Sequence, residues 1–174
     1  MSAHRAALAL AGMAFGAQAC TDSMMDPDPG AAVFLSATPS GQAVDVRPDG
    51  PIMLRFSGPM MARMERYVDL HRGGLSDPTV PMGCAWSADR ATLTCRPDSP
   101  MERRTRYTLH MGGGLRDAAG RRIDTDQHRR HMGGEWADSA RMGGMHSGTR
   151  MGDMPAGWRH PNGSIGMTFE FLTS

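Results

Sequence analysis

Short runs in which apolar and polar residues alternate recur along the chain from residue 33 to its end. Alternation with a period of two is typical of strands that are buried on one face. Turn-forming residues separate these runs, and no window of about twelve residues in the mature chain shows a helical stripe. The pattern predicts an all-β fold, an antiparallel β-sandwich of about seven short strands. The predicted strands are residues 33–38, 52–56, 67–72, 82–86, 91–95, 107–111 and 168–172.

The alternation also assigns a face to each side chain. Val68 and Leu70 are expected to face the core, and so is Leu109 in a later strand. His71 and His110 lie on these strand-like segments, each next to such an apolar residue. We therefore expect both histidines to be exposed polar positions.

The first 19 residues have the features of a signal peptide. The apolar run over residues 6–17 is long enough for the hydrophobic region of a signal and too short to span a bilayer. It leads into the sequence AQAC, which ends at Cys20 and resembles the lipobox of bacterial lipoproteins. This resemblance implies lipidation of Cys20, and an ordinary secretory signal cut at the same site is the alternative. Residues 20–32 then comprise the lipidated Cys and a polar tether.

Two further cysteines, Cys84 and Cys95, lie on two predicted strands joined by a short loop. Export permits a disulfide between them. If the tight turn centres on Asp89 and Arg90, the two cysteines lie directly opposite each other, at the short Cβ separation that a disulfide needs. In a shifted register they lie diagonally. A pair of metal-binding thiolates is the alternative, which an oxidising compartment disfavours.

Several short motifs follow one another in a fixed order. They are a Pro/Gly turn after Thr38, IMLRFSGPM at 52–60, ATLTCRP at 91–97, YTLHM at 107–111, DAAG at 117–120 and FEFLT at 169–173. In this order the motifs resemble bacterial SbsA-type Ig-like domains. The resemblance implies an Ig-like sandwich over residues 33–174, with a long insertion before the last strand. It also implies a structural or interaction module of an exported protein, with no catalytic residues.

The inserted loop, residues 127–166, is rich in Met, His and Gly, and its only Val, Leu or Ile residue is Ile165. Core packing is therefore a poor explanation for its Met residues. Thioether and imidazole ligands without thiolate favour copper, Cu(I) above all. The resemblance places the connection after residues 52–56 at the same end of the sandwich, which adds two Met residues. The candidate metal ligands are Met61, Met64, His128, His131, Met132, Met142, Met145, His146, Met151, Met154 and His160.

Two other interpretations of this loop stay open. It is either a Gly-rich surface loop without a specific role, or a loop that Trp136 and Trp158 fold onto the sandwich with Met as adaptable filler.

The net charge of the chain and the catalytic motifs that it lacks limit the functions it could have. The formal net charge is +1, with 19 basic and 18 acidic residues, which argues against a nucleic-acid partner. The sequence has no Lys for a phosphate loop, no G-x-S-x-G and no H-E-x-x-H, so no enzyme is predicted. We expect a lipid-anchored module of the cell envelope that faces the periplasm, with the membrane and an envelope protein as its partners. Copper bound through the Met/His-rich loop is the expected cofactor.

Two alternatives to this function remain. One is a structural or protein-interaction module of the envelope with no metal role. The other is a copper carrier that resembles the CopC family, whose mature chains start with a His that binds Cu(II). A mature chain that starts at Cys20 does not have that ligand.

Overall fold

The seven runs of alternating residues and two shorter segments form nine strands in the part of the chain that the structure describes. This computed structural model describes residues 30–125, 157–159 and 166–174. A single turn of 3-10 helix, η1 (Met64–Tyr67), precedes the fourth strand. The strands are β1 (Phe34–Thr38), β2 (Ala43–Val46), β3 (Ile52–Phe56), β4 (Val68–Arg72), β5 (Thr79–Val80), β6 (Met82–Trp86), β7 (Thr92–Pro97), β8 (Arg106–Met111) and β9 (Met167–Thr173).

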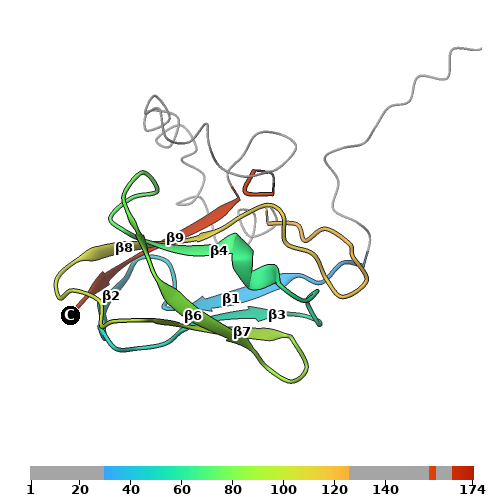
Figure 1. The fold of residues 1–174 in the computed structure, drawn as a ribbon, viewed down its shortest axis with the longest axis horizontal. Coiled ribbons are helices and arrows are strands. Elements are labelled where there is room, and N and C mark those ends of the chain that lie inside the picture. Colours follow the sequence, from blue (N-terminus) through green and yellow to red (C-terminus); the bar gives the residue numbers. More distant parts are fainter. Residues whose placement is uncertain (1–29, 126–156, 160–165) are drawn as a thin grey trace, which may run out of the picture.

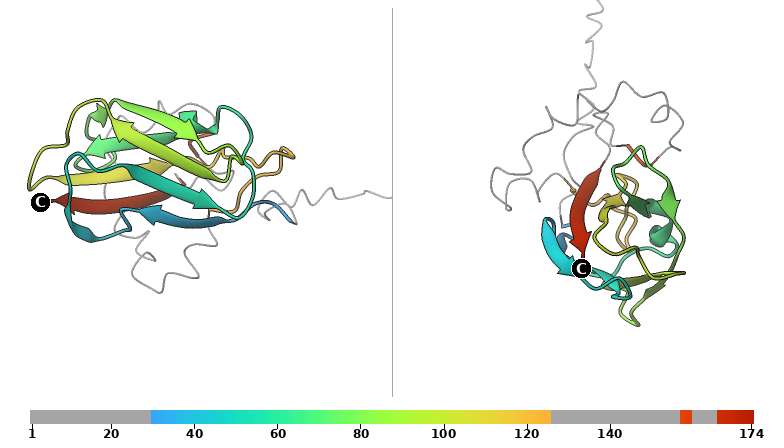
Figure 2. Two further views of the ribbon diagram at one scale, coloured as in Figure 1. Left: turned by 90° about the horizontal axis from the view of Figure 1, so that it is seen from below. Right: turned by 90° about the vertical axis from the view of Figure 1, so that its left-hand side faces the viewer.

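The strands form two sheets that face each other (Figures 1 and 2). One has four strands in the order β1-β3-β7-β6, and the other has five in the order β2-β9-β8-β4-β5. The predicted all-β sandwich is confirmed. Its strand count is higher than expected because β2 and β5 are too short to show alternation, and β2 pairs with β9 in parallel rather than antiparallel.

The core lies between the inner faces of the two sheets. Leu54, Leu93 and Leu109 are completely buried there, on β3, β7 and β8. Phe34 bridges the sheets, because its ring centroid lies 5.7 Å from that of Phe56 and 5.5 Å from that of Phe169. Each such side chain stabilises the fold by about 1.5–3 kcal/mol relative to an exposed one. The alternation of the sequence is thus what brings the two sheets together.

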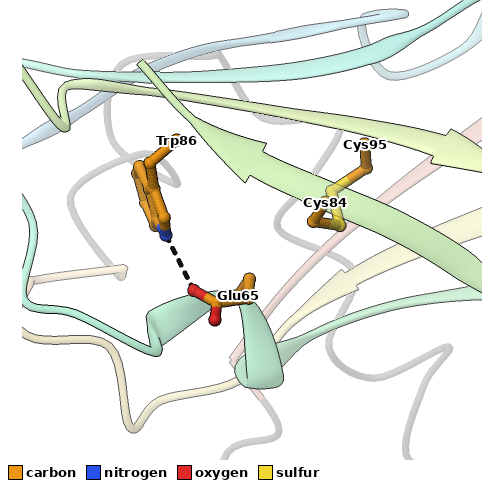
Figure 3. The surroundings of a disulfide bond; sticks show 4 residues. All are labelled: Glu65, Cys84, Trp86 and Cys95. Carbon is orange, nitrogen blue, oxygen red and sulfur yellow. Dashed lines mark hydrogen bonds between the residues drawn. A yellow bond between two sulfur atoms is a disulfide. The ribbon is translucent and has the colours of Figure 1, made fainter. Parts of the chain in front are cut away.

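The two cysteines lie directly opposite each other on β6 and β7 and form a disulfide (Figure 3). The turn over residues 87–90 sets this register, because Arg90 N–H donates to Ser87 O and Ser87 N–H donates to Thr92 O. Two residues from Cys84, Trp86 Nε1 donates to the Glu65 carboxylate of η1 at 2.8 Å. The disulfide fastens the edge strand β6 to β7, and this hydrogen bond fastens it to η1.

The start of β1 and the connections after β3 and β8 lie at one end of the sandwich, opposite the C-terminus (Figure 1). Asp117 of the connection after β8 is buried among them and forms a backbone bridge with Met60 in the connection after β3. Its carboxylate accepts hydrogen bonds from Ala32 N–H, from Ala119 N–H and from the backbone and guanidinium of Arg121. Burial by itself would raise the pKa of Asp117, but the hydrogen bonds from Arg121 and Ala32 outweigh it and lower the pKa below its usual value.

Replacing both cysteines, Cys84→Ala with Cys95→Ala, is expected to lower the free energy of unfolding by about 3 kcal/mol. The reason is that the bridge closes a loop with a sequence separation of 11 residues, which limits the unfolded chain. Urea unfolding measures this. Reductant should destabilise the unaltered protein by a similar amount and leave the variant unchanged. A reductant-insensitive unaltered protein would contradict the prediction.

Asp117→Asn is expected to lower the free energy of unfolding by about 1–3 kcal/mol at neutral pH, because buried donors lose a charged acceptor. A depressed carboxyl pKa stabilises the fold above the unfolded value of about 3.9. This stability is lost as the pH falls through the lower pKa of the folded state, so the difference between the two proteins should shrink towards pH 2. Urea unfolding at several pH values tests this, with the exposed Asp98→Asn as a control that should show no such difference.

Candidate metal centre

Three potential metal ligands lie on the outer face of the five-stranded sheet, away from the core. Asp69 and His71 are two residues apart on β4 and therefore share a face. His110 of β8 is the direct cross-strand partner of Asp69. One ligand atom from each of the three lies within 4.8 Å of the others. The core residues Leu70 and Leu109 point to the other side of the same strand pair.

This outer face is buried, contrary to the sequence-based expectation. His110 is 0% exposed and His71 only 4%, while Asp69 is half-buried. The prediction that both histidines are exposed polar positions is therefore wrong. The alternation assigned them correctly to the side away from the core, but that side is covered as well.

Residues 157–159 supply part of the cover (Figure 1). The Trp158 ring centroid lies 5.0 Å from that of His110 and 6.0 Å from that of Tyr67, in an edge-to-face arrangement with the latter. Gly112 permits this close approach, because a Cβ at its position would lie 2.8 Å from Trp158 Cε3. A φ of 103° at Gly157 lets the chain turn into this position.

A backbone contact fixes the orientation of the His71 ring. Its Nδ1 lies 2.9 Å from the carbonyl oxygen of Asp77, in the connection between β4 and β5. A carbonyl can only accept, so Nδ1 carries the proton and the lone pair of a neutral ring is on Nε2. Nε2 is buried and has no hydrogen-bond partner among the described residues.

The carboxylate of the group is poorly solvated. Burial raises the pKa of Asp69, and the charge of His71 acts in the opposite direction. A carboxyl group in this setting favours a nearby positive charge, which a metal ion would supply. Two imidazoles and one carboxylate are a donor set that binds divalent transition metals.

The two predicted Met ligands within the described residues have packing contacts. Met64 is buried in the core, and its sulfur lies 3.2 Å from the N–H of Arg116. Met61 is half-buried against the core, and its backbone N–H donates to Arg116 O. Arg116 of the connection after β8 therefore lies against the connection after β3, whereas the contact predicted for residues 127–166 lies outside the described residues. The other predicted sites lie outside the described residues, namely Cys20, His128, His131, Met132, Met142, Met145, His146, Met151, Met154 and His160.

The sequence analysis did not select Asp69, His71 and His110 as a group. The spacing of Asp69 and His71 was the available signal, because two residues at i and i+2 of a strand share a face. The pairing of β4 with β8, which adds His110, joins segments about 40 residues apart and has no local signature.

Trp158→Ala is expected to expose His110 to chemical modification. Diethylpyrocarbonate should modify His110 about tenfold faster in the variant, which equals about 1.4 kcal/mol of lost protection. Mass spectrometry of peptides gives the rate for each histidine separately. Trp86→Phe, on the opposite sheet, is the control and should keep His110 protected. Equal rates in the unaltered protein and in Trp158→Ala would show that Trp158 does not shield the histidine.

Among the described residues, no helix is long and apolar enough to cross a membrane.

Comparison with solved structures finds proteins of low sequence identity. The N-terminal part of the bacterial S-layer protein SbsC is 13% identical, with a TM-score of 0.44, over 82% of this chain and 23% of that chain. PcoC, a methionine-rich copper resistance protein from Escherichia coli, is 14% identical, with a TM-score of 0.45, over 82% of this chain and 98% of that chain. CopC from Methylosinus trichosporium OB3b is 12% identical, with a TM-score of 0.45, over 82% of this chain and 93% of that chain. This chain thus spans less than a quarter of the S-layer chain.

A search of curated proteins gives no significant match. The profile of the bacterial Ig-like domain, in contrast, matches residues 28–130, which is more than half of the chain. This span contains β1 to β8 and all three residues of the His/Asp group. The chain therefore belongs to the bacterial Ig-like domain family.

Proposed function

We propose that this chain is a lipid-anchored Ig-like module of the cell envelope, without enzymatic activity, that binds or buffers copper through the Met/His-rich residues 127–166. One observation carries the proposal. Trp158, one of the few described residues of this segment, packs over His110, so this point of the segment lies next to buried imidazoles. The Trp158 contact supports a loop that lies against the sandwich, and the proposal adds that its Met and His residues bind copper rather than act as filler.

The choice of copper rests on ligand chemistry. The segment combines thioethers and imidazoles with no cysteine, and soft thioethers favour Cu(I). Cys84 and Cys95 are joined to each other, so their thiols do not compete for the ion. In an oxidising compartment, Met keeps its ligand character where paired cysteines lose theirs.

The location outside the cytoplasm has two supports. The chain belongs to the bacterial Ig-like domains, and it contains a disulfide, which persists in oxidising compartments. The anchor is a lipid on Cys20. Residues 20–32 reach at most about 40 Å when extended, so the lipid would hold the end of the sandwich around Asp117 close to the membrane surface. The membrane and an envelope protein are the proposed partners.

Bacterial Ig-like domains are usually non-catalytic. A module that binds and holds copper needs a ligand set but no nucleophile or general base. This agrees with a sequence in which neither G-x-S-x-G nor H-E-x-x-H occurs. A purely structural or interaction module of the envelope is the competing function, and it predicts no copper binding.

Replacing the five Met residues of the segment by Leu is expected to lower Cu(I) affinity at least tenfold, the effect of about 1.4 kcal/mol. Leu keeps the volume and removes the thioether donor. Competition with a chromophoric Cu(I) chelator, in ascorbate, measures the affinity of the mature chain. The substituted residues are Met132, Met142, Met145, Met151 and Met154.

The matched control replaces Met24 and Met25, which lie in the proposed tether, by Leu and should leave Cu(I) affinity unchanged. Unaltered affinity in the five-residue variant would refute the role of the segment. If the unaltered protein itself does not bind Cu(I), the purely structural function is the correct one.

A further inference from the structure

We propose that Asp69, His71 and His110 form a second metal site, which takes a divalent transition-metal ion such as Zn(II) or Cu(II). This site lies on the sandwich itself and uses none of the thioethers of residues 127–166. The inference goes beyond the proposed function, because it holds whether or not that segment binds Cu(I).

The first support is the rigidity of the scaffold. β4 and β8 are neighbouring strands in the five-stranded sheet, and five consecutive residue pairs join them in register. Asp69 and His110 form one of these pairs, so their Cβ atoms are held a few ångströms apart on the same face. The ligand atoms lie within 4.8 Å of one another, somewhat wider than the spacing of ligands around an ion with bonds of about 2.0–2.2 Å, so a bound ion would draw them together.

The second support is the state of the His71 ring. Its Nδ1–H donates to the carbonyl oxygen of Asp77, which leaves the lone pair of Nε2 as the coordinating atom. Metal-binding histidines commonly donate their other N–H to a backbone carbonyl, which fixes the ring. Nε2 is buried and has no hydrogen-bond partner among the described residues. A buried nitrogen in this state costs free energy unless something occupies its lone pair.

The third support is the balance of nearby charge. Asp69 brings one negative charge into a half-buried position, next to two imidazoles that bind a metal in their neutral form. The guanidinium of Arg106, on the same strand as His110, lies 3.4 Å from the carboxylate of Glu170. Arg72, next to His71 in sequence, pairs with Glu102. These cations are therefore engaged elsewhere and oppose an ion at the site less than free guanidinium groups would.

The donor set decides the class of ion. Ca²⁺ and Mg²⁺ prefer ligand sets made entirely of oxygen, and Cu(I) prefers thioethers and thiolates. Two imidazoles with one carboxylate suit a borderline divalent ion, and three protein ligands leave one coordination position for water or a small anion. Trp158 packs on His110 from outside the sheet, so this apolar ring shields the site from bulk solvent.

Zn(II) is the probe for this site, because it has no redox chemistry. The chain has seven His residues, and His4 leaves with the signal. Replacing the four His of residues 127–166 by Gln therefore leaves only His71 and His110 in the mature chain. This background protein, without a His tag, is expected to bind one equivalent of Zn(II) in a competition titration with a chromophoric chelator. The replaced residues are His128, His131, His146 and His160.

In that background, His71→Gln and Asp69→Asn are each expected to weaken Zn(II) binding at least tenfold. Thr168→Val is the matched control, because Thr168 is buried, pairs with His110 across β8 and β9, and is not one of the three ligands. It should leave Zn(II) affinity unchanged. Circular dichroism of each metal-free variant shows whether it folds, and Asp69→Asn, which keeps the shape of the side chain, decides the question if His71→Gln does not fold.

Two results would overturn the site. One is no Zn(II) binding by the folded background protein, and the other is undiminished affinity in a folded His71→Gln or Asp69→Asn variant. Neither result bears on the five-residue Met variant, whose Cu(I) affinity tests the proposed function alone. The two proposals can thus fail separately.

Discussion

The burial of β8 on both faces is the constraint on which the candidate site depends. The inner face of this strand packs in the core through Tyr107 and Leu109, as in any sandwich. Antiparallel sheets of sandwiches commonly leave the outer face in water, but here Thr108 and His110 are buried as well. Polar side chains in such a place must find partners or a ligand, because burial without either is costly.

The cover over β8 needs residues that have no side chain. Gly112 follows directly after β8, and any Cβ there would collide with the Trp158 ring and with the carbonyl oxygen of Gly157. The composition shows only that glycine is frequent in the chain, whereas the structure shows why it is needed at position 112. It lets a segment far along the chain lie directly on the sheet and form a local third layer. The same contact brings an aromatic ring against the imidazole of His110.

Much of the fold could be predicted from the sequence, because alternation reports which face of a strand is apolar. It placed Leu70 and Leu109 in the core and the two cysteines on one hairpin, and the motif order indicated the family. The burial of His71 and His110 could not be predicted. Alternation says which face a side chain is on, but not what covers that face, and the covering residues 157–159 have no periodic pattern.

The role of individual Met residues could not be predicted from the sequence either. The sequence could not tell Met64 from the Met residues of the loop, because nothing in its local pattern shows that the connection folds back on the core. In the structure its sulfur lies near the Arg116 N–H inside a packed cluster.

The disulfide decides which metal chemistry remains open to this chain. With Cys84 and Cys95 joined, the mature sandwich has no free thiolate, which is the ligand that otherwise dominates soft-metal binding. The remaining potential ligands are of two kinds, soft thioethers and the harder carboxylate and imidazole groups. Five thioethers lie in residues 127–166, and the half-buried carboxylate of Asp69 and the buried imidazoles of His71 and His110 lie on neighbouring strands. An ion that changes between Cu(I) and Cu(II) changes its preferred ligands at the same time, so these two donor sets would hold different oxidation states.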